Sequence, residues 1–156
     1  MQIKKVVFPT DFSRTSKAAL DFAESLVRDT GGKLYIVHVE EPPAAYGGGD
    51  MFYGIPSATL EDVKRLLLSF VPSDQKVPYE HHLVHGAPAE AITEFADSVD
   101  ADLIVIGTHG RTGLNRMLMG SVAEAVVRHA NRPVLSYKAK ANPQKAGEPA
   151  PAAAPA

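Results

Sequence analysis

The sequence contains no cysteine among its 156 residues. Disulfide frameworks and thiolate chemistry are therefore excluded, and the composition fits a reducing compartment, so we expect a cytoplasmic protein. Long hydrophobic runs are missing as well, because none approaches the roughly 18 residues that a membrane span needs. The first residues, MQIKKVVFPTDFS, hold only a short apolar run that Pro9 breaks, which is not the form of a signal peptide. We expect no association with a membrane.

An excess of basic residues is also absent, since the formal net charge is −2. Non-specific binding of nucleic acid needs a basic face, so we expect no nucleic-acid partner, although a local cationic pocket stays compatible with this charge. Hydrophobic residues make up 45% of the chain, which is enough for one domain with a buried core.

Apolar segments with two different periodicities alternate along the chain. Short β-branched runs predict buried strands, and longer segments with apolar residues at helical spacing predict amphipathic helices. The expected strands span residues 3–9, 33–39, 77–86, 102–107 and 133–138, and the expected helices span 14–30, 57–70, 88–99 and 121–130. This alternation is the sequence form of an α/β domain with a mostly parallel sheet.

Residues with strong local preferences mark the boundaries of these elements. Asp11 and Ser13 are candidate N-caps of the first helix, and the glycine pair 31–32 ends it. Ser57 is the candidate cap of the second helix. Residues 41–56 are too rich in proline and glycine for regular structure, so we expect a surface loop there.

The chain changes character after residue 138. From there on it consists mainly of alanine, proline and lysine, with little to bury. We therefore predict one domain over residues 1–138 and a disordered Ala/Pro-rich tail over residues 139–156.

The stretch GTHGRTGLNRMLMGS, from Gly107 to Ser121, places glycines between a strand and a helix. Such a loop lies at the carboxyl edge of the sheet, where open α/β folds bind ligands. Glycine lets the backbone approach a phosphate, and a helix N-terminus offers unpaired N–H groups with partial positive charge. The alternative needs no ligand, because Ser121 and Glu124 form the S-x-x-E pattern of a capping box. The stretch has no P-loop pattern, and no G-x-G-x-x-G fingerprint follows the first strand.

Two polar residues near the predicted loops allow both a structural and a functional interpretation. Asp11 is either a helix cap or a ligand contact. His109, inside the glycine-rich stretch, either contacts a phosphate when protonated or lies at the surface.

The remaining histidines do not form a metal-binding pattern. His81 and His85 would share one face of a strand while His82 points to the other, and no cysteine or acidic partner completes a set, so we predict no metal site. His38, at the end of a strand, has the position of a structural histidine.

The spacing G-x2-G, nine residues, then G-S after an apolar strand closely resembles the ATP-binding signature of the universal stress protein family. The similarity extends to VVFPTDFS, to VHV at 37–39, to GAPAEAITEFA at 86–96 and to NRPVLSYK, so it covers residues 3–138. It implies a five-stranded parallel sheet in the order 3-2-1-4-5 with helices on both faces, a Rossmann-like fold of the adenine nucleotide alpha hydrolase-like type. The loops PTDFS and GTHGRTG would then flank one crevice at the switch point of the sheet.

The same resemblance implies an adenosine site. Asp11 would bind the adenosine, and the backbone of Val39 would hydrogen-bond adenine. Pro9 and Thr10 would shape the pocket, and Gly107 would approach the ribose.

For the phosphates, the resemblance implies a site at the end of the glycine-rich stretch. Gly110, Gly120, Ser121 and the N–H of Val122 would hold the phosphate oxygens, with the side chains of Arg111 and Arg116 as charged neighbours. A divalent ion, Mg²⁺, would accompany the phosphates of ATP.

The function that follows is an ATP-binding regulatory or sensing module of the stress response. We expect a homodimer through the exposed edge strand 133–138. The spacing assembles no nucleophile, base and orienting residue, so we predict no catalytic residues and slow or no hydrolysis. The alternatives are a slow ATPase or nucleotidyl-transfer enzyme on the same fold, and a dimeric interaction protein without nucleotide. The sequence does not indicate the downstream protein partner.

Overall fold

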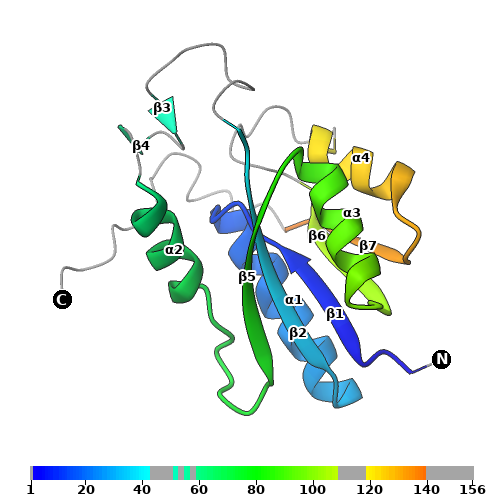
Figure 1. The fold of residues 1–156 in the computed structure, drawn as a ribbon. Helices are drawn as coiled ribbons and strands as arrows, with labels where there is room; N and C mark the ends of the chain where they lie inside the picture. The colour runs from blue at the N-terminus through cyan, green and yellow to red at the C-terminus, as the bar shows by residue number, and fades with distance from the viewer. Residues whose placement is uncertain (1, 43–50, 53–54, 57–58, 109–118, 140–156) are drawn as a thin grey trace.

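The computed structural model describes residues 2–42, 51–52, 55–56, 59–108 and 119–139. Its main element is a five-stranded parallel sheet in the order β5-β2-β1-β6-β7 (Figure 1). The strands are β1 (Lys5–Pro9), β2 (Lys33–Glu40), β5 (Tyr79–His85), β6 (Leu103–Gly107) and β7 (Val134–Tyr137). Counted along these five strands, the order is 3-2-1-4-5, which confirms the fold class expected from the sequence.

Helices cover both faces of the sheet. On one face lie α1 (Arg14–Thr30) and α2 (Leu60–Ser69), and on the other lie α3 (Pro88–Ser98) and α4 (Ser121–His129) (Figure 1). Parallel strands buried on both faces are expected to be apolar without interruption. The central strand β1 follows this rule, because Val6, Val7 and Phe8 are all fully buried.

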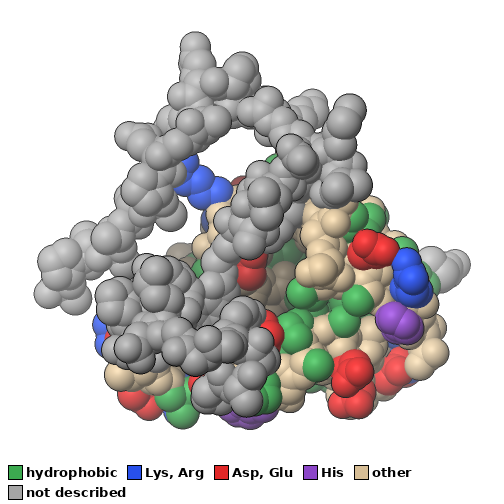
Figure 2. All heavy atoms as spheres, turned by 90° about the horizontal axis from the view of Figure 1, so that it is seen from above, with side chains coloured by type: hydrophobic (Ala, Val, Ile, Leu, Met, Phe, Trp, Pro, Cys, Tyr) green, Lys and Arg blue, Asp and Glu red, His purple; other side chains and the backbone are tan. Residues whose placement is uncertain are grey.

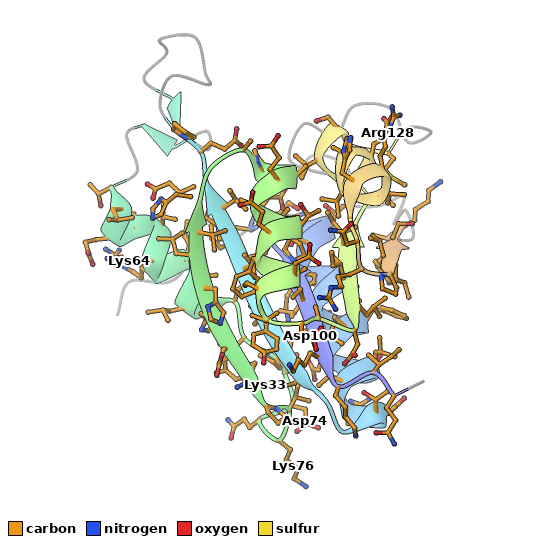
Figure 3. All side chains as sticks on the ribbon, turned by 45° about the vertical axis from the view of Figure 1, so that its right-hand side comes forward. Lys33, Lys64, Asp74, Lys76, Asp100 and Arg128 are labelled. Carbon is orange, nitrogen blue, oxygen red and sulfur yellow. The ribbon has the colours of Figure 1, made fainter. Side chains whose placement is uncertain are left out.

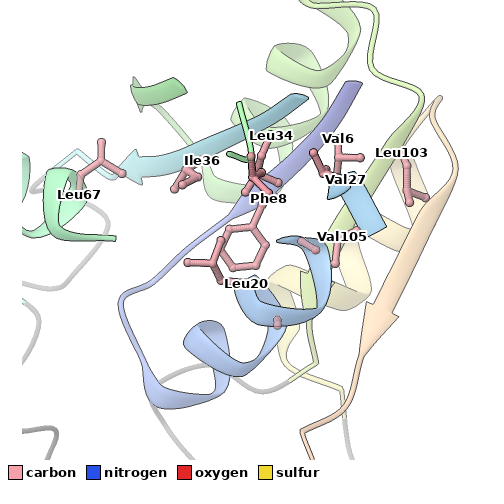
Figure 4. Close-up of a cluster of buried hydrophobic side chains, with 12 residues drawn as sticks. Val6, Phe8, Leu20, Val27, Leu34, Ile36, Leu67, Leu103 and Val105 are labelled. Carbon is pink, nitrogen blue, oxygen red and sulfur yellow. The ribbon is translucent and has the colours of Figure 1, made fainter. Parts of the chain in front are cut away.

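Two hydrophobic clusters separate the sheet from its two helical layers. The first packs Phe8 and Val105 of the sheet against Leu20 and Val27 of α1 (Figure 4). The second packs alternate residues of the same strands against α3 and α4. Adjacent residues of a strand thus belong to opposite clusters, as strand geometry requires.

Local signals explain the boundaries of α1. Ser13 is its N-cap, and the Ser13 side chain accepts a hydrogen bond from the N–H of Ser16. Gly31 ends the helix in the left-handed conformation with φ of 63°, which glycine adopts without strain. A Cβ at Gly32 would lie 2.8 Å from the carbonyl oxygen of Lys4, so the second glycine is required by close packing against β1.

The segment at 41–56 differs from the sequence-based expectation. It contains two short antiparallel strands, β3 (Met51–Phe52) and β4 (Ile55–Pro56), where we expected no regular structure. The paired residues are mostly apolar, Met51 with Pro56 and Phe52 with Ile55, and the glycines of the segment lie outside both strands.

The caps predicted for α2 and α4 are both wrong. Helix α2 is capped by Thr59, which forms a capping box with Asp62, whereas Ser57 lies outside the described residues. Helix α4 begins one residue earlier than the predicted capping box requires: Gly120 is the N-cap, and its carbonyl already accepts the N–H of Glu124. Ser121 is thus the first helical residue, and α4 has no side-chain cap.

Three further predictions fall outside the described residues. The inner part of the glycine-rich stretch spans 109–118, the middle of the proline- and glycine-rich segment spans 43–50, and the predicted disordered tail begins at 139, of which 140–156 is not described. Among the described helices, none has the length and hydrophobicity needed to cross a bilayer.

A carboxylate joins the first strand to the fourth at the amino edge of the sheet. The Asp102 side chain accepts hydrogen bonds from the backbone N–H groups of Lys4 (2.8 Å) and Lys5 (2.9 Å). These bonds stabilise the charged form, so the pKa of the Asp102 carboxyl lies below its ordinary value of 3.8. Asp102 therefore holds the start of β1 beside β6.

We expect the two helix caps to differ in their contribution to stability. Thr59→Ala removes a bond to an otherwise unpaired N–H at the start of α2 and should lower the free energy of unfolding by about 1 kcal/mol. Ser121→Ala removes no cap bond and should change it by less than about 0.5 kcal/mol. Urea unfolding of both variants measures the difference. An equal loss of unfolding free energy in the two variants would show that Ser121 does act as a cap.

Asp102 should also make stability depend on pH in the acid range. Because its folded-state pKa is lowered, its contribution is fully present above the unfolded-state pKa and is lost as the pH falls through the folded-state value. Asp102→Asn should be less stable than the wild type at pH 7, and the difference should shrink below about pH 4. Asp21→Asn, which removes an exposed ion pair with Lys17, is the control and should show little difference at any pH.

Candidate functional site

The switch point of the sheet lies between β1 and β6, the two neighbouring strands from which the chain turns to opposite sides. Val7 of β1 is paired with Ile104 of β6, so the ends of the two strands, Pro9 and Gly107, lie at nearly the same height. Crevices in open α/β folds form at this position, beyond the carboxyl ends of the strands.

The backbone of two neighbouring strands continues past the point where β1 leaves the sheet. The last bond of β1 to β2 runs from the N–H of Thr10 to the carbonyl of Val37 (2.8 Å). Backbone groups two residues apart in a strand point to the same side, so those of Val39 face the space beyond the end of β1. The backbone of Gly107 faces the same space from β6, because its neighbour Thr108 donates to Tyr137 on the other side.

The loop from β1 to α1 forms the floor of this space. The Thr10 hydroxyl oxygen accepts the backbone N–H of Phe12 (3.0 Å) and the hydroxyl of Ser16 (2.8 Å). The Asp11 carboxylate accepts the N–H of Ser13 at 3.0 Å, a turn that aspartate favours. Asp11 is therefore a turn residue beside the crevice. Of the two candidate caps of α1, Asp11 and Ser13, it is Ser13 that caps the helix.

A short hydrogen bond closes the base of the glycine-rich stretch. The N–H of Gly120 donates to the carbonyl of Thr108 at 2.7 Å, which holds the start of α4 against the end of β6. A Cβ added at Gly107 would lie 3.8 Å from Ala19 and from the carbonyl of Thr15, an ordinary contact. Protein packing among the described residues therefore does not demand glycine at this position.

The amino end of α4 presents backbone donors near the crevice. The N–H of Gly120 is used by Thr108, and the first bond within the helix is donated by Glu124. The N–H groups of Ser121, Val122 and Ala123 lie between them and receive no side-chain cap. Their orientation and the partial positive charge of the helix end suit an anion.

Charged side chains of both signs lie at this edge within the described part of the chain. Figure 2 views the carboxyl edge from above, where acidic and basic side chains lie scattered among hydrophobic ones. Lys33, Lys76 and Asp100 lie toward the opposite end of the sheet (Figure 3). The donors that the described hydrogen bonds place near the crevice are the backbone N–H groups at the start of α4.

Two ion pairs lie away from the crevice, at the amino edge of the sheet. A hydrogen bond from Lys33 lowers the pKa of Glu80, and a hydrogen bond from Arg132 lowers the pKa of Asp97. Lys33 begins β2 and Arg132 precedes β7, so both pairs stabilise the amino edge of the sheet.

The structure brings together eight of the residues predicted for the site. They lie at the carboxyl edge around β1 and β6 and are Pro9, Thr10, Asp11, Val39, Gly107, Gly120, Ser121 and Val122. Four others, His109, Gly110, Arg111 and Arg116, lie outside the described residues. The sequence analysis missed the N–H of Ala123 and the hydroxyl of Ser16. The S/T-rich run after Asp11 was the only signal for Ser16.

The histidines of β5 have separate partners. His81 contacts the carbonyl oxygen of Phe70 (2.8 Å), His82 pairs with Glu80 (3.2 Å), and His85 pairs with Glu40 (3.0 Å). Within the described ranges, no group of three histidine or acidic residues has a geometry that could hold a metal ion.

The fold defines an α/β protein of the open, doubly wound class. The model of the universal stress protein family matches residues 2–138, and the chain belongs to this family. Universal stress protein MJ0531 of Methanocaldococcus jannaschii is 34% identical over 146 residues, which cover 86% of this chain and 82% of that protein.

Two solved structures with bound ligands are similar to this chain. The universal stress protein from Archaeoglobus fulgidus in complex with dAMP has a TM-score of 0.62 and 31% identity, covering 87% of this chain and 98% of that one. A universal stress protein in complex with cAMP has a TM-score of 0.57 and 30% identity, covering 87% and 97%.

Proposed function

We propose that this protein binds ATP in the crevice between β1 and β6 and acts as a small regulatory or sensing module in the cytoplasm. The observation that carries the proposal is the amino end of α4. The N–H groups of Ser121, Val122 and Ala123 have no side-chain cap there, and the bond from Gly120 to Thr108 holds this helix end beside the end of β6. Such a helix end binds phosphate through its backbone donors and its dipole.

The two ligand complexes among the similar structures support an adenine base. dAMP and cAMP share adenine and a phosphate and differ in the sugar and in phosphate geometry. In this chain the backbone of Val39 would read the edge of the base, because it faces the space beyond the end of β1. Asp11 would bind the adenosine, and the buried Pro9 and Thr10 would line the pocket beneath it.

The phosphates would lie on the opposite side of the crevice. Gly107 would admit the ribose, and Gly120 would leave room for phosphate oxygens beside the start of α4. Gly110, Arg111, Arg116 and His109 are proposed as further contacts from the intact sequence pattern. Mg²⁺ would be held mainly by the phosphates, since the described residues form no group of metal ligands.

Binding rather than turnover is the proposed activity. In the loop from β1 to α1, the Asp11 carboxylate already accepts the N–H of Ser13. The described base–carboxylate pair at this edge, His85 with Glu40 (3.0 Å), joins the ends of β5 and β2 and not the switch point between β1 and β6. A slow ATPase therefore remains the alternative within the same site.

A second copy of the chain is the proposed partner at β7. Within the described residues β7 pairs only with β6 and forms one edge of the sheet. The carbonyls of Pro133 and Tyr137 accept bonds from β6, so the backbone groups of Val134 and Ser136 point to the free edge. Pairing of this edge with its copy would satisfy them.

Two side chains of β7 pack toward the interior of the domain. Leu135 and Tyr137 pack against the cluster under α1, and the Tyr137 ring stacks on Phe22 with centroids 5.2 Å apart. They therefore belong to the core, so acidic substitutions there would disrupt the fold together with any dimer.

The nucleotide proposal predicts selective binding of ATP. Isothermal titration calorimetry should show saturable binding of ATP in the presence of Mg²⁺, weaker binding of AMP, and little binding of GTP, whose base edge carries different donors and acceptors. Mass spectrometry of the freshly purified protein should detect an adenine nucleotide. No heat with ATP and no co-purified nucleotide would reject the proposal.

Substitution of Gly120 locates the phosphates within this prediction. Gly120 has φ of −60° and ψ of 151°, a conformation open to any residue, so the fold should survive a side chain there. Gly120→Glu should abolish ATP binding through steric overlap and charge repulsion. Gly120→Gln, which has the same size without the charge, should retain measurable affinity for ATP. Equal losses of affinity in the two variants would show that steric overlap alone prevents binding.

The dimer proposal predicts a monomer after loss of one backbone donor. Ser136→Pro removes an N–H that points to the free edge and leaves the bonds between β7 and β6 in place. Light scattering coupled to size exclusion should give a dimer for the wild type and a monomer for the variant, at an unchanged circular dichroism spectrum. A folded Ser136→Pro protein that is still dimeric would place the interface elsewhere.

A further inference from the structure

A buried histidine lies directly under the loop that carries Asp11. His38 stands near the carboxyl end of β2 with 2% of its surface exposed. Its Nδ1 lies 2.8 Å from the carbonyl oxygen of Thr10. A carbonyl only accepts hydrogen bonds, so Nδ1 carries the proton and donates it. The bond joins β2 to the first residue of the loop, across 28 positions of sequence.

The same imidazole ring supports an unusual backbone conformation. Phe12 has φ of 64°, in the left-handed region that residues other than glycine rarely occupy. The Phe12 ring stacks on the His38 ring with centroids 4.3 Å apart and an angle of 29°, and it meets the edge of Phe70 at 5.8 Å. These ring contacts offset the strain at Phe12.

Asp11 is therefore held between two anchored neighbours. Thr10 is fixed through its carbonyl by His38, and through its hydroxyl by Ser16. Phe12 is fixed through its N–H by Thr10, and through its ring by His38. One side chain, His38, thus contacts the residue on each side of Asp11.

Core packing alone does not account for a histidine at this position. Ile36, which lies on the same face of β2 two residues earlier, is a fully buried isoleucine, and an apolar side chain at position 38 would avoid the desolvation of an imidazole. What the histidine adds is a donor for a carbonyl that has left the sheet ladder, because the last ladder bond of β1 is made by the N–H of the same residue.

We propose that His38 is a positioning residue of the nucleotide site. It sets the conformation of Thr10–Phe12 through the Nδ1–H bond and the ring stack, and so fixes the place of the Asp11 carboxylate for adenosine. This inference rests on the function proposed above, and His38 itself need not touch the nucleotide.

Two substitutions separate the donor from the ring. His38→Phe keeps an aromatic ring of similar size against Phe12 and removes the donor. His38→Asn removes the ring and places an amide N–H close to the position of Nδ1. His82→Phe is the control, because His82 lies on the other face of the sheet against Phe95 and does not contact the loop.

Two measurements are made on each full-length protein. Calorimetry gives the affinity for Mg²⁺-ATP, and hydrogen exchange by NMR gives the protection of the Phe12 and Ser13 amides, whose bonds hold the loop. His38→Phe should weaken ATP binding by about tenfold, the size expected for loss of one well-placed hydrogen bond. It should also speed the exchange of both amides. His38→Asn should restore most of the affinity, and His82→Phe should match the wild type.

Several outcomes would overturn the inference. A folded His38→Phe protein with wild-type affinity and wild-type amide protection would do so. Equal losses in His38→Phe and His38→Asn, with faster exchange throughout β2, would assign His38 to general stability instead.

ATP binding by the wild-type protein distinguishes a failure of the nucleotide proposal from a failure of the role proposed for His38. If the wild type binds no ATP, that proposal fails, while the exchange of the two amides still decides whether His38 orders the loop. Should His38→Phe not fold, Phe12→Leu removes the same ring stack from a half-buried position. Unchanged amide exchange in Phe12→Leu would then reject the role of the stack.

Discussion

The early departure of β1 from the sheet is the constraint on which the rest of the site depends. The first strand is central and flanked on both sides, yet its last ladder bond is made by Thr10 while β2 continues to Glu40. The backbones of Val39 and Gly107 are left facing a space without a strand between them. Topology and strand length thus favour a ligand site at this place, before any side chain is considered.

The two hydrophobic clusters make the frame around this crevice rigid. Each face of the sheet is covered by two helices, and the central strands are buried on both faces. At the amino edge, Asp102 and the Arg132–Asp97 pair close the structure with hydrogen bonds. The carboxyl edge keeps backbone donors at the start of α4 instead, so the two ends of the same sheet have different chemistry.

Recognition by backbone groups has a consequence for side chains near the site. Main-chain donors are placed by the positions of strands and helices, so residues that fix the path of the loop matter as much as those that would touch a ligand. His38, Phe12 and Ser16 are of this kind. Their contacts hold Thr10 and Phe12, the residues on either side of Asp11.

The sequence by itself determined the elements whose signals are local. The period of the apolar residues located α1 from Arg14 to Thr30, the glycine at 31 ended it, and the uninterrupted apolar run located β6. The strand order followed from resemblance to a family, not from the pattern. Cap assignments at Ser57 and Ser121 failed because a helix start depends on a shift of one or two residues, which several nearby polar side chains allow equally well. Only the tertiary structure decided that Val39 and Gly107 face one space, that β3 pairs with β4, and that His38 meets Thr10. These contacts join residues that lie far apart in the chain or depend on register, and no local preference encodes which partner the folded chain will bring.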